Sequence, residues 1–224
     1  MKERNGISQE GLKVLACLTM LIDHIGAIFF PYYRWMRIIG RISFPIYCFL
    51  LAEGVHYTRN PIKYGLRLLL VAILVEFPYD LLFSGQFTWS KNSAMVTLLL
   101  GFCAGIAIKQ VPGWWKLLTP VPFILLGKYL HGSYGMYGVA MIVMFVLLRD
   151  IPYAKAAQLI AMVLLSLRMA GFPGRVSIQI YAVAAMLPIL LYNGKKHSHN
   201  KVMQWAFTLF YPLHILVLLL IRGF

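Results

Sequence analysis

The sequence has little charge and very few acidic residues. Only 12% of its 224 residues are charged, and seven are Asp or Glu, whereas soluble domains carry roughly 25% charged residues. Apolar residues make up 60% of the chain and the mean hydropathy is +0.74. A disordered chain is excluded because disorder requires low hydrophobicity, and a small soluble domain could not bury so much apolar surface. The composition predicts a polytopic membrane protein.

The sequence also has few cysteines and lacks the common nucleotide-binding and serine hydrolase motifs. The three cysteines, Cys17, Cys48 and Cys103, show no CxxC or Cys/His spacing, so a disulfide framework and a zinc site are not supported. We expect them to be buried as small apolar side chains. No Walker loop, GxGxxG or GxSxG is present, which argues against ATP-driven transport and serine hydrolase chemistry.

Basic residues, in contrast, are abundant. There are 21 Lys and Arg, and the formal net charge is +14. Most of them lie between apolar runs, where they indicate membrane topology and contact with anionic lipid headgroups. No nucleic-acid-binding motif accompanies them, so we expect the bilayer, and no nucleic acid, as a partner. Loops on the side of the N-terminus carry twelve basic residues against seven on the other, which predicts a multi-pass cell-membrane protein with a cytoplasmic N-terminus.

The apolar runs predict an all-α bundle of about nine helices that forms a single domain over residues 1–224. Gly, Pro, Asn and basic clusters separate the runs. The fifth run carries Pro120 and Pro122, so this segment is expected to be kinked or re-entrant. The predicted helices are 10–31, 36–57, 62–84, 92–109, 114–130, 134–149, 154–171, 175–192 and 201–222.

Ionisable side chains inside these runs are the strongest functional signal. An ionised group at the centre of a bilayer costs about 3 kcal/mol on insertion scales, so such groups face the interior and usually mark a functional cavity. With alternating helix directions, polar residues from six segments fall in one layer of the outer half of the membrane. They are Asp23, His24, Arg41, Glu76, Asp80, Asn92, His131 and His214. The pattern predicts a polar intramembrane cavity.

Six of these eight residues also have a structural interpretation. Asp23 and Arg41 could form an ion pair that only joins two helices, and His24 could be a neutral hydrogen-bond donor. Glu76 and Asp80 share a helix face and could simply neutralise arginines. His131 could be an interfacial residue. A single Glu-x-x-His pair, Glu53 and His56, is too little for a diiron bundle, so no metal is expected.

Several segments, occurring in the same order along the chain, resemble the TraX family of membrane proteins. They are Thr19–Gly26, Arg37–Ile46, Leu51–Gly54, Thr58–Asn60, Glu76–Leu81, Leu191–Lys195 and Phe210–His214. The namesake of this family acetylates the N-terminal amine of conjugative pilin, and the family is distantly similar to polytopic acyltransferases that use acyl-CoA. The resemblance therefore implies a membrane acyltransferase with acetyl-CoA as the donor and a peptide, glycan or small molecule as the acceptor.

This implied activity assigns a role to each candidate residue. His24 would act as general base oriented by Asp23, Arg41 would stabilise the oxyanion, and His214 would be a second base or proton relay. The acceptor would be bound by Glu76, Asp80, Asn92 and His131, and the phosphates of CoA by Arg59, Lys63, Arg67, Lys195 and Lys196.

Two other classes of protein remain open. A proton-coupled secondary transporter or exporter would use the same carboxylates and histidines as a relay. The chain is short for two inverted halves, however, and shows no paired broken helices. A non-catalytic assembly protein would tolerate alanine at Asp23 and Arg41 apart from a loss of stability.

Overall fold

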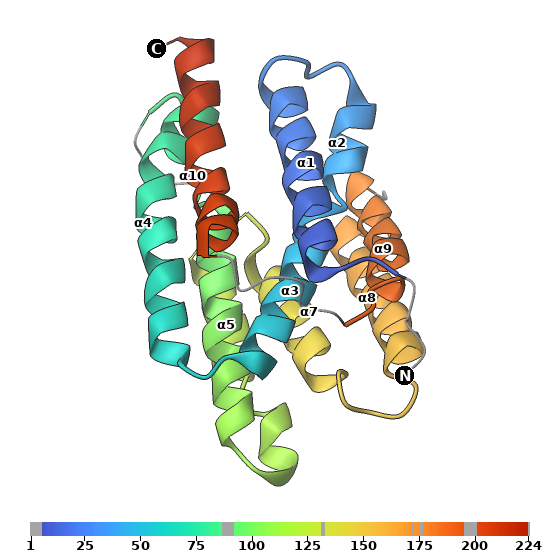
Figure 1. Cartoon of the computed structure of the whole chain (residues 1–224). Helices are drawn as coiled ribbons and strands as arrows, with labels where there is room; N and C mark the ends of the chain where they lie inside the picture. The colour runs from blue at the N-terminus through green and yellow to red at the C-terminus, as the bar shows by residue number, and fades with distance from the viewer. Residues whose placement is uncertain are drawn as a thin grey trace. The chain divides into compact units, whose positions relative to one another are not determined.

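The computed structural model describes residues 6–86, 92–130, 133–171, 173–174, 177–194 and 201–223 (Figure 1). Helices dominate these ranges, and an isolated bridge pairs Ile7 with Tyr192. The predicted all-α class is confirmed. The α-helices are α1 Gln9–Ile28, α2 Arg34–Gly40, α3 Ser43–Tyr57, α4 Pro61–Ser84, α5 Ala94–Gln110, α6 Val121–Tyr129, α7 Gly135–Leu147, α8 Ala154–Ala170, α9 Met186–Leu190 and α10 Lys201–Arg222, and the 3₁₀-helices are η1 Gly113–Leu117 and η2 Ile178–Ala185.

Local capping chemistry sets the boundaries of the long helices. Ser8 accepts a hydrogen bond from the backbone N–H of Gly11 at 3.1 Å and starts α1. Asn60 accepts from the N–H of Lys63 at 2.9 Å and starts α4. Gly85 ends α4 in the left-handed conformation, φ 71°, which glycine adopts without steric cost.

Two predicted spans are not regular α-helices. The segment expected at 114–130 consists of η1 and the nine-residue α6, which rises only about 14 Å against a hydrocarbon core of about 30 Å. Pro120 and Pro122 lie at its start, where a helix tolerates proline because the first N–H groups have no partner within the helix. The segment expected at 175–192 is η2 followed by α9, because Pro188 removes a helical donor and clashes with the preceding turn.

The second predicted span, 36–57, is interrupted once. Its two parts, α2 and α3, meet at a turn over Arg41 and Ile42. Within this turn the backbone N–H of Arg41 donates to the carbonyl of Ile38 at 3.1 Å, which is the tighter 3₁₀ spacing. The interruption follows Gly40, a residue that weakens a helix interior.

The protein is a membrane protein. Three helical segments, Gln9–Ile28, Arg34–Tyr57 and Val202–Arg222, are long and apolar enough to cross a bilayer. Shorter apolar helical segments are Ala94–Gln110, Gly135–Leu147 and Ile178–Leu190. Helix α4 has 24 residues but carries four charged side chains, those of Lys63, Arg67, Glu76 and Asp80.

The chain forms two compact units, each made of two separate stretches of sequence. The first unit comprises Met1–Leu50 and Tyr153–Phe210. Within it, α1 and α2 form an antiparallel pair (Figure 1), and α8 packs against η2. The backbone of Ile7 exchanges hydrogen bonds with the 191–193 segment, donating to Leu191 at 2.9 Å and accepting from Asn193 at 3.1 Å. The N-terminal segment is thereby joined to the later stretch of this unit.

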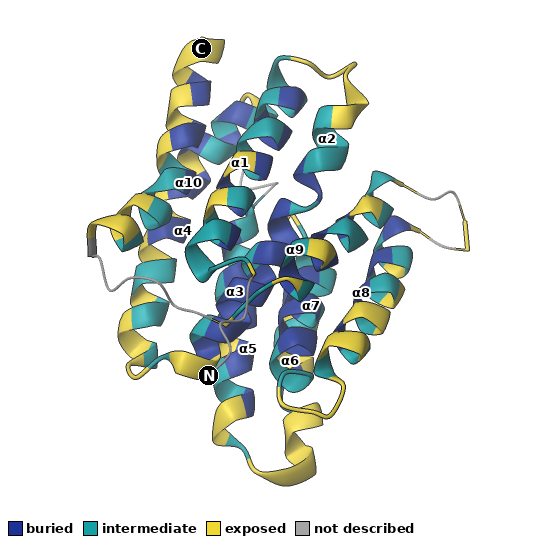
Figure 2. Ribbon diagram, turned by 45° about the vertical axis from the view of Figure 1, so that its right-hand side comes forward, coloured by how far each residue is buried: buried dark blue, intermediate teal, exposed yellow. Residues whose placement is uncertain are grey.

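The second unit comprises Leu51–Pro152 and Tyr211–Phe224. Helix α5 contacts α4, α6 and α7, and α7 is buried along most of its length (Figure 2). The cysteines show no disulfide: Cys17 and Cys48 are buried as expected, but Cys103 is exposed. The expectation was wrong for Cys103 because the neighbouring α5 residues Gly101, Phe102 and Ala104 occupy the packed face.

The contact between α5 and α7 depends on Gly101. A Cβ atom at this position would lie 2.1 Å from Cδ1 of Ile142. We expect Gly101→Ala to lower the free energy of unfolding by about 1–3 kcal/mol through overpacking, measured by thermal unfolding in detergent. Ile142→Val, which removes Cδ1, should restore part of the loss in the double variant, and Cys103→Ala on the exposed face is the control. Equal stability of Gly101→Ala and Cys103→Ala would contradict this account of the packing.

Candidate functional site

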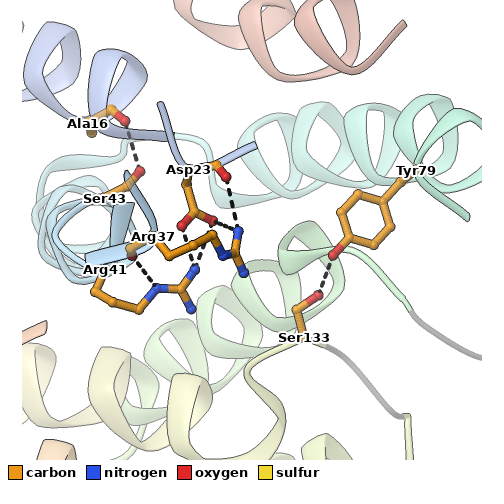
Figure 3. Close-up of polar contacts among 7 residues, drawn as sticks. All are labelled: Ala16, Asp23, Arg37, Arg41, Ser43, Tyr79 and Ser133. Carbon is orange, nitrogen blue, oxygen red and sulfur yellow. Dashed lines mark hydrogen bonds and ion pairs between the residues drawn. The ribbon is translucent and has the colours of Figure 1, made fainter. Parts of the chain in front are cut away.

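A cluster of one buried carboxylate and two guanidinium groups, one buried and one partly exposed, lies between α1 and α2 in the first unit. Nη2 of Arg41 lies 2.7 Å from Oδ1 and 2.8 Å from Oδ2 of Asp23. Nη1 of Arg37 lies 2.8 Å from Oδ2 of the same carboxylate and donates to the backbone carbonyl of Asp23 at 3.1 Å. Figure 3 shows the Asp23 carboxylate between the two arginines.

Close approach of the two helices makes this arrangement possible. A Cβ atom on Gly40 would lie 2.1 Å from Oδ1 of Asp23, and one on Gly26 would lie 2.6 Å from Cβ of Met36. Glycine is therefore required at both positions for α1 and α2 to meet. After the turn, the hydroxyl of Ser43 donates to the carbonyl of Ala16 at 2.8 Å (Figure 3), which fixes the start of α3 against α1.

The ion pair of Asp23 and Arg41 was predicted as one interpretation of the sequence, but Arg37 was missed. Arg37 lies at the start of the predicted helix 36–57 and was counted only among the basic residues that indicate topology. The signal that could have identified it is its spacing, because Arg37 and Arg41 lie four residues apart and share one face of a helix. Arg41 reinforces this by donating from Nε to the carbonyl of Arg37 at 3.2 Å.

His24 follows Asp23 directly and is buried in α1. Consecutive helical residues point about 100° apart, so His24 presents its ring to a different side of α1 from the carboxylate. The carboxylate oxygens of Asp23 are engaged by Arg37 and Arg41. The expectation that Asp23 orients His24 stays a prediction.

In the second unit, the Glu76 carboxylate caps the start of α5. Its Oε1 accepts from the backbone N–H of Ser93 at 3.0 Å and from the hydroxyl of Ser93 at 2.6 Å. Oε2 accepts from the same N–H at 3.1 Å. A carboxylate at a helix N-terminus is stabilised by the free N–H groups and the helix dipole. Glu76 is therefore neutralised by a helix end, a partner that sequence spacing did not reveal.

Asn92 ties the start of α5 to the turn before α7. Its Nδ2 donates to the carbonyl of Leu130 at 2.5 Å, and its backbone carbonyl accepts from the hydroxyl of Ser133 at 2.8 Å. The hydroxyls of Ser133 and Tyr79 lie 3.0 Å apart (Figure 3). Asn92 and Glu76 are thus brought together at the start of α5, whereas His131 lies outside the described residues.

The other predicted residues of this unit are buried as well. Asp80 lies one turn after Glu76 on α4, and both are buried. His214 is buried on α10, with its ring centroid 5.5 Å from that of Tyr211. Asp23, His24 and Arg41 belong to one unit, and Glu76, Asp80, Asn92 and His214 to the other. Their meeting in a single cavity stays a prediction.

Glu53 forms an ion pair instead of a metal site. Nε of Arg149 lies 2.7 Å from Oε1 of Glu53, and its Nη2 donates to the hydroxyl of Tyr57 at 2.9 Å. Burial lowers the pKa of the Arg149 guanidinium, but the hydrogen bond and charge of Glu53 and the hydrogen bond of Asp150 raise it above its ordinary value, so Arg149 is always charged. Across the described ranges, no three His, Cys, Asp or Glu side chains are grouped to hold a metal.

Three of the five basic residues expected to bind CoA lie in the part of the chain that the structure describes. Arg59 and Lys63 are exposed at the turn from α3 to α4, and the Arg67 guanidinium lies 4.8 Å from the ring centroid of Tyr64. Lys195 and Lys196 lie outside the described residues. Arg59, Lys63 and Arg67 therefore gather near the start of α4.

We expect Asp23→Asn to destabilise the protein strongly. The variant leaves Arg37 and Arg41 without their carboxylate in a largely buried site, which costs about 3 kcal/mol or more. The matched control is Asp150→Asn: its carboxylate pairs with Arg149 at 2.7 Å but is 69% exposed, so the change should stay below about 1 kcal/mol. Chemical or thermal unfolding in detergent measures both variants. If Asp23→Asn and Asp150→Asn lowered stability by similar amounts, the cluster around Asp23 would contribute no more than an exposed ion pair.

We expect Ser93→Ala to loosen the junction of α4 and α5. The hydroxyl of Ser93 donates to Glu76 and accepts from the N–H of Met95 at 3.2 Å, so its removal should lower stability by about 1–2 kcal/mol. Ser93→Thr, which keeps the hydroxyl, should retain most of it. Thr119→Val, which removes a surface hydroxyl bonded to the carbonyl of Trp115, is the control. If Ser93→Ala had the same unfolding temperature as the wild-type protein, this role of the hydroxyl would be refuted.

Comparisons with known proteins agree over most of the chain. A family model described as TraX protein matches residues 8–222. The probable fimbrial assembly protein FimC, serogroup H1, of Dichelobacter nodosus is 30% identical over 233 residues, which cover 92% of each chain. Protein TraX of Escherichia coli is 25% identical over 217 residues, which cover 92% of this chain and 84% of its own. No solved structure matches.

Proposed function

The chain belongs to the TraX family, and we propose that it is a membrane-embedded acyltransferase that moves an acetyl group from acetyl-CoA to an amine or hydroxyl. The observation that carries the proposal is the Asp23–Arg37–Arg41 cluster, with the buried His24 following Asp23 directly in α1. Acyl transfer needs a base for the attacking group and a positive group for the oxyanion. The imidazole of His24 and the fixed guanidinium of Arg41 would supply the two groups.

In this proposal, His24 and Arg41 carry out the chemistry. His24 takes the proton from the acceptor amine or hydroxyl, which attacks the carbonyl carbon of the thioester. The guanidinium of Arg41 stabilises the negative charge on the carbonyl oxygen, and the bond to sulfur then breaks. The proton passes to the CoA thiolate. Asp23 acts as a positioning residue, because its carboxylate holds Arg41 at 2.7 Å and keeps the guanidinium from turning away.

The donor is proposed to enter from the cytoplasmic end of α1. His24 lies fifteen residues after Gln9, which is about 22 Å along the helix, a depth that the extended pantetheine arm of CoA can reach. The phosphates of CoA would then stay at the membrane surface, where basic loops attract anions. Arg59, Lys63, Arg67, Lys195 and Lys196 are proposed to bind them.

Glu76, Asp80, Asn92 and His131 are proposed to bind an amine or hydroxyls of the acceptor. His214 would serve as a second base or proton relay. The name of the Dichelobacter nodosus relative, a probable fimbrial assembly protein, supports a peptide acceptor in a surface fibre. Enzymatic transfer is favoured over proton-coupled transport because the Asp23 carboxylate is held by two arginines instead of facing a proton path.

We expect His24→Gln to lower kcat for acetyl transfer about a hundredfold or more, because a positioned general base contributes at least that factor. The measurement is transfer of label from acetyl-CoA to peptide amines by the purified protein in detergent. The matched control is His56→Gln: His56 is exposed at the end of α3, and its loss should leave kcat unchanged. Full activity of His24→Gln would remove it as the base. Substrate flux into vesicles driven by pH without CoA would overturn the enzyme proposal.

A further inference from the structure

Only one of the three nitrogen atoms of the Arg37 guanidinium, Nη1, donates hydrogen bonds to described residues. Both of its hydrogen bonds to Asp23 use Nη1, and the edge formed by Nε and Nη2 donates to no residue within the described ranges. The side chain is 30% exposed, compared with 7% for Arg41. The free edge of Arg37 is therefore open to a ligand, while the other edge is fixed by the protein.

The Asp23 carboxylate already accepts three hydrogen bonds from the two arginines, none of them from the Nε–Nη2 edge of Arg37. Its Oδ1 accepts from Arg41, and its Oδ2 accepts from both arginines. The other acidic residues in the sequence stretches of this unit are Glu3 and Glu10. Glu10 precedes Asp23 by thirteen residues on α1, about 20 Å along the helix, so it does not serve the same site.

The position of Arg37 gives the direction from which a ligand would come. The turn between α1 and α2 exposes aromatic residues, Phe30, Tyr32, Tyr33 and Trp35, which are typical of the membrane–water interface. Arg37 lies about one helical turn beyond Tyr33, and Arg41 lies one turn further. Arg37 thus stands between the interface and the proposed reaction centre at Arg41.

We propose that the Nε–Nη2 edge of Arg37 binds an anionic group, a carboxylate or a phosphate, on the acceptor. Two parallel N–H groups match two oxygens of such a group, which makes arginine better suited to it than lysine. The inference rests on the proposed acyl transfer. The phosphates of CoA, proposed to remain at the opposite membrane surface, are about 20 Å away along α1, so an anion at Arg37 belongs to the molecule that enters from the aromatic turn.

This site would orient the acceptor for attack at the thioester. With its anionic group held by Arg37, the acceptor would present its amine to His24, which removes one proton. The N–C bond forms, the C–S bond of acetyl-CoA breaks, and the CoA thiolate takes up the proton. Arg37 is a positioning residue in this step, so its loss should raise KM for the acceptor more than it lowers kcat.

Three small amines with the same aminoethyl group test the proposal. They are ethanolamine, β-alanine and O-phosphoethanolamine, which end in a hydroxyl, a carboxylate and a phosphate. Calorimetry on the purified protein should show that the two anionic amines bind at least about tenfold more tightly than ethanolamine, the value of a charged hydrogen-bonded pair. Arg37→Gln should abolish this preference, and Arg37→Lys should keep only part of it. Arg34→Gln removes an exposed arginine at the start of α2 and should preserve it.

The outcomes separate this site from the proposed enzyme activity. Equal binding of the three amines, or an unchanged preference in Arg37→Gln while its unfolding temperature matches wild type, would overturn the anion site. Anion preference without any acetyl transfer would overturn the proposed function and leave the site intact. Loss of copurifying anionic lipid in Arg37→Gln, with no binding of soluble amines, would identify a lipid headgroup as the source of the anion.

Discussion

An ionised carboxylate inside a membrane protein must have its counter-charge beside it, and this constraint organises the first unit. Asp23 meets two guanidinium groups at 2.7–2.8 Å, because a single buried ion pair is stable only when its geometry is good and the remaining polar atoms are satisfied. The requirement fixes the register of α1 against α2 and demands glycine at position 40. The turn that ends α2 then directs Arg41 back toward α1. Charge compensation thus determines the backbone path as well as the chemistry.

In the second unit, the buried Glu76 carboxylate is stabilised by a helix N-terminus instead of an arginine. There the carboxylate accepts from the backbone N–H and hydroxyl of Ser93, so that a helix N-terminus supplies the positive end. The two solutions have different chemical consequences. Arginines remain charged under all conditions and keep a fixed field around Asp23. The Glu76 carboxylate on a helix N-terminus meets only the partial charge of the helix end.

Much of the fold could be predicted from the sequence, because apolar runs and their breaks define α1, α4, α5 and α10. The turn chemistry at Asn60–Pro61 and at Gly85 also gave correct boundaries. Regularity within a run was harder to predict: Pro120, Pro122 and Pro188 turn apolar segments into short or 3₁₀ helices. Of the site, the pairing of Asp23 with Arg41 followed from intramembrane charge. The roles of Arg37 and Ser93 did not, because they depend on which side chain reaches across to a neighbouring helix.

Each unit is built from two separate stretches of the chain, and this has a consequence for biosynthesis. Residues up to Leu50 belong with residues 153–210, while the intervening stretch builds the other unit. Chains emerge from the ribosome N-terminus first, at roughly 5–20 residues per second, so the opening helices wait several seconds for the segments that complete their packing. During that interval α1 and α2 contact only each other within their unit. The ion pairs of Arg37 and Arg41 with Asp23 can already form and stabilise this helix pair. The segment around Leu191 then closes this unit onto Ile7, which makes its assembly one of the last events of translocon-assisted insertion.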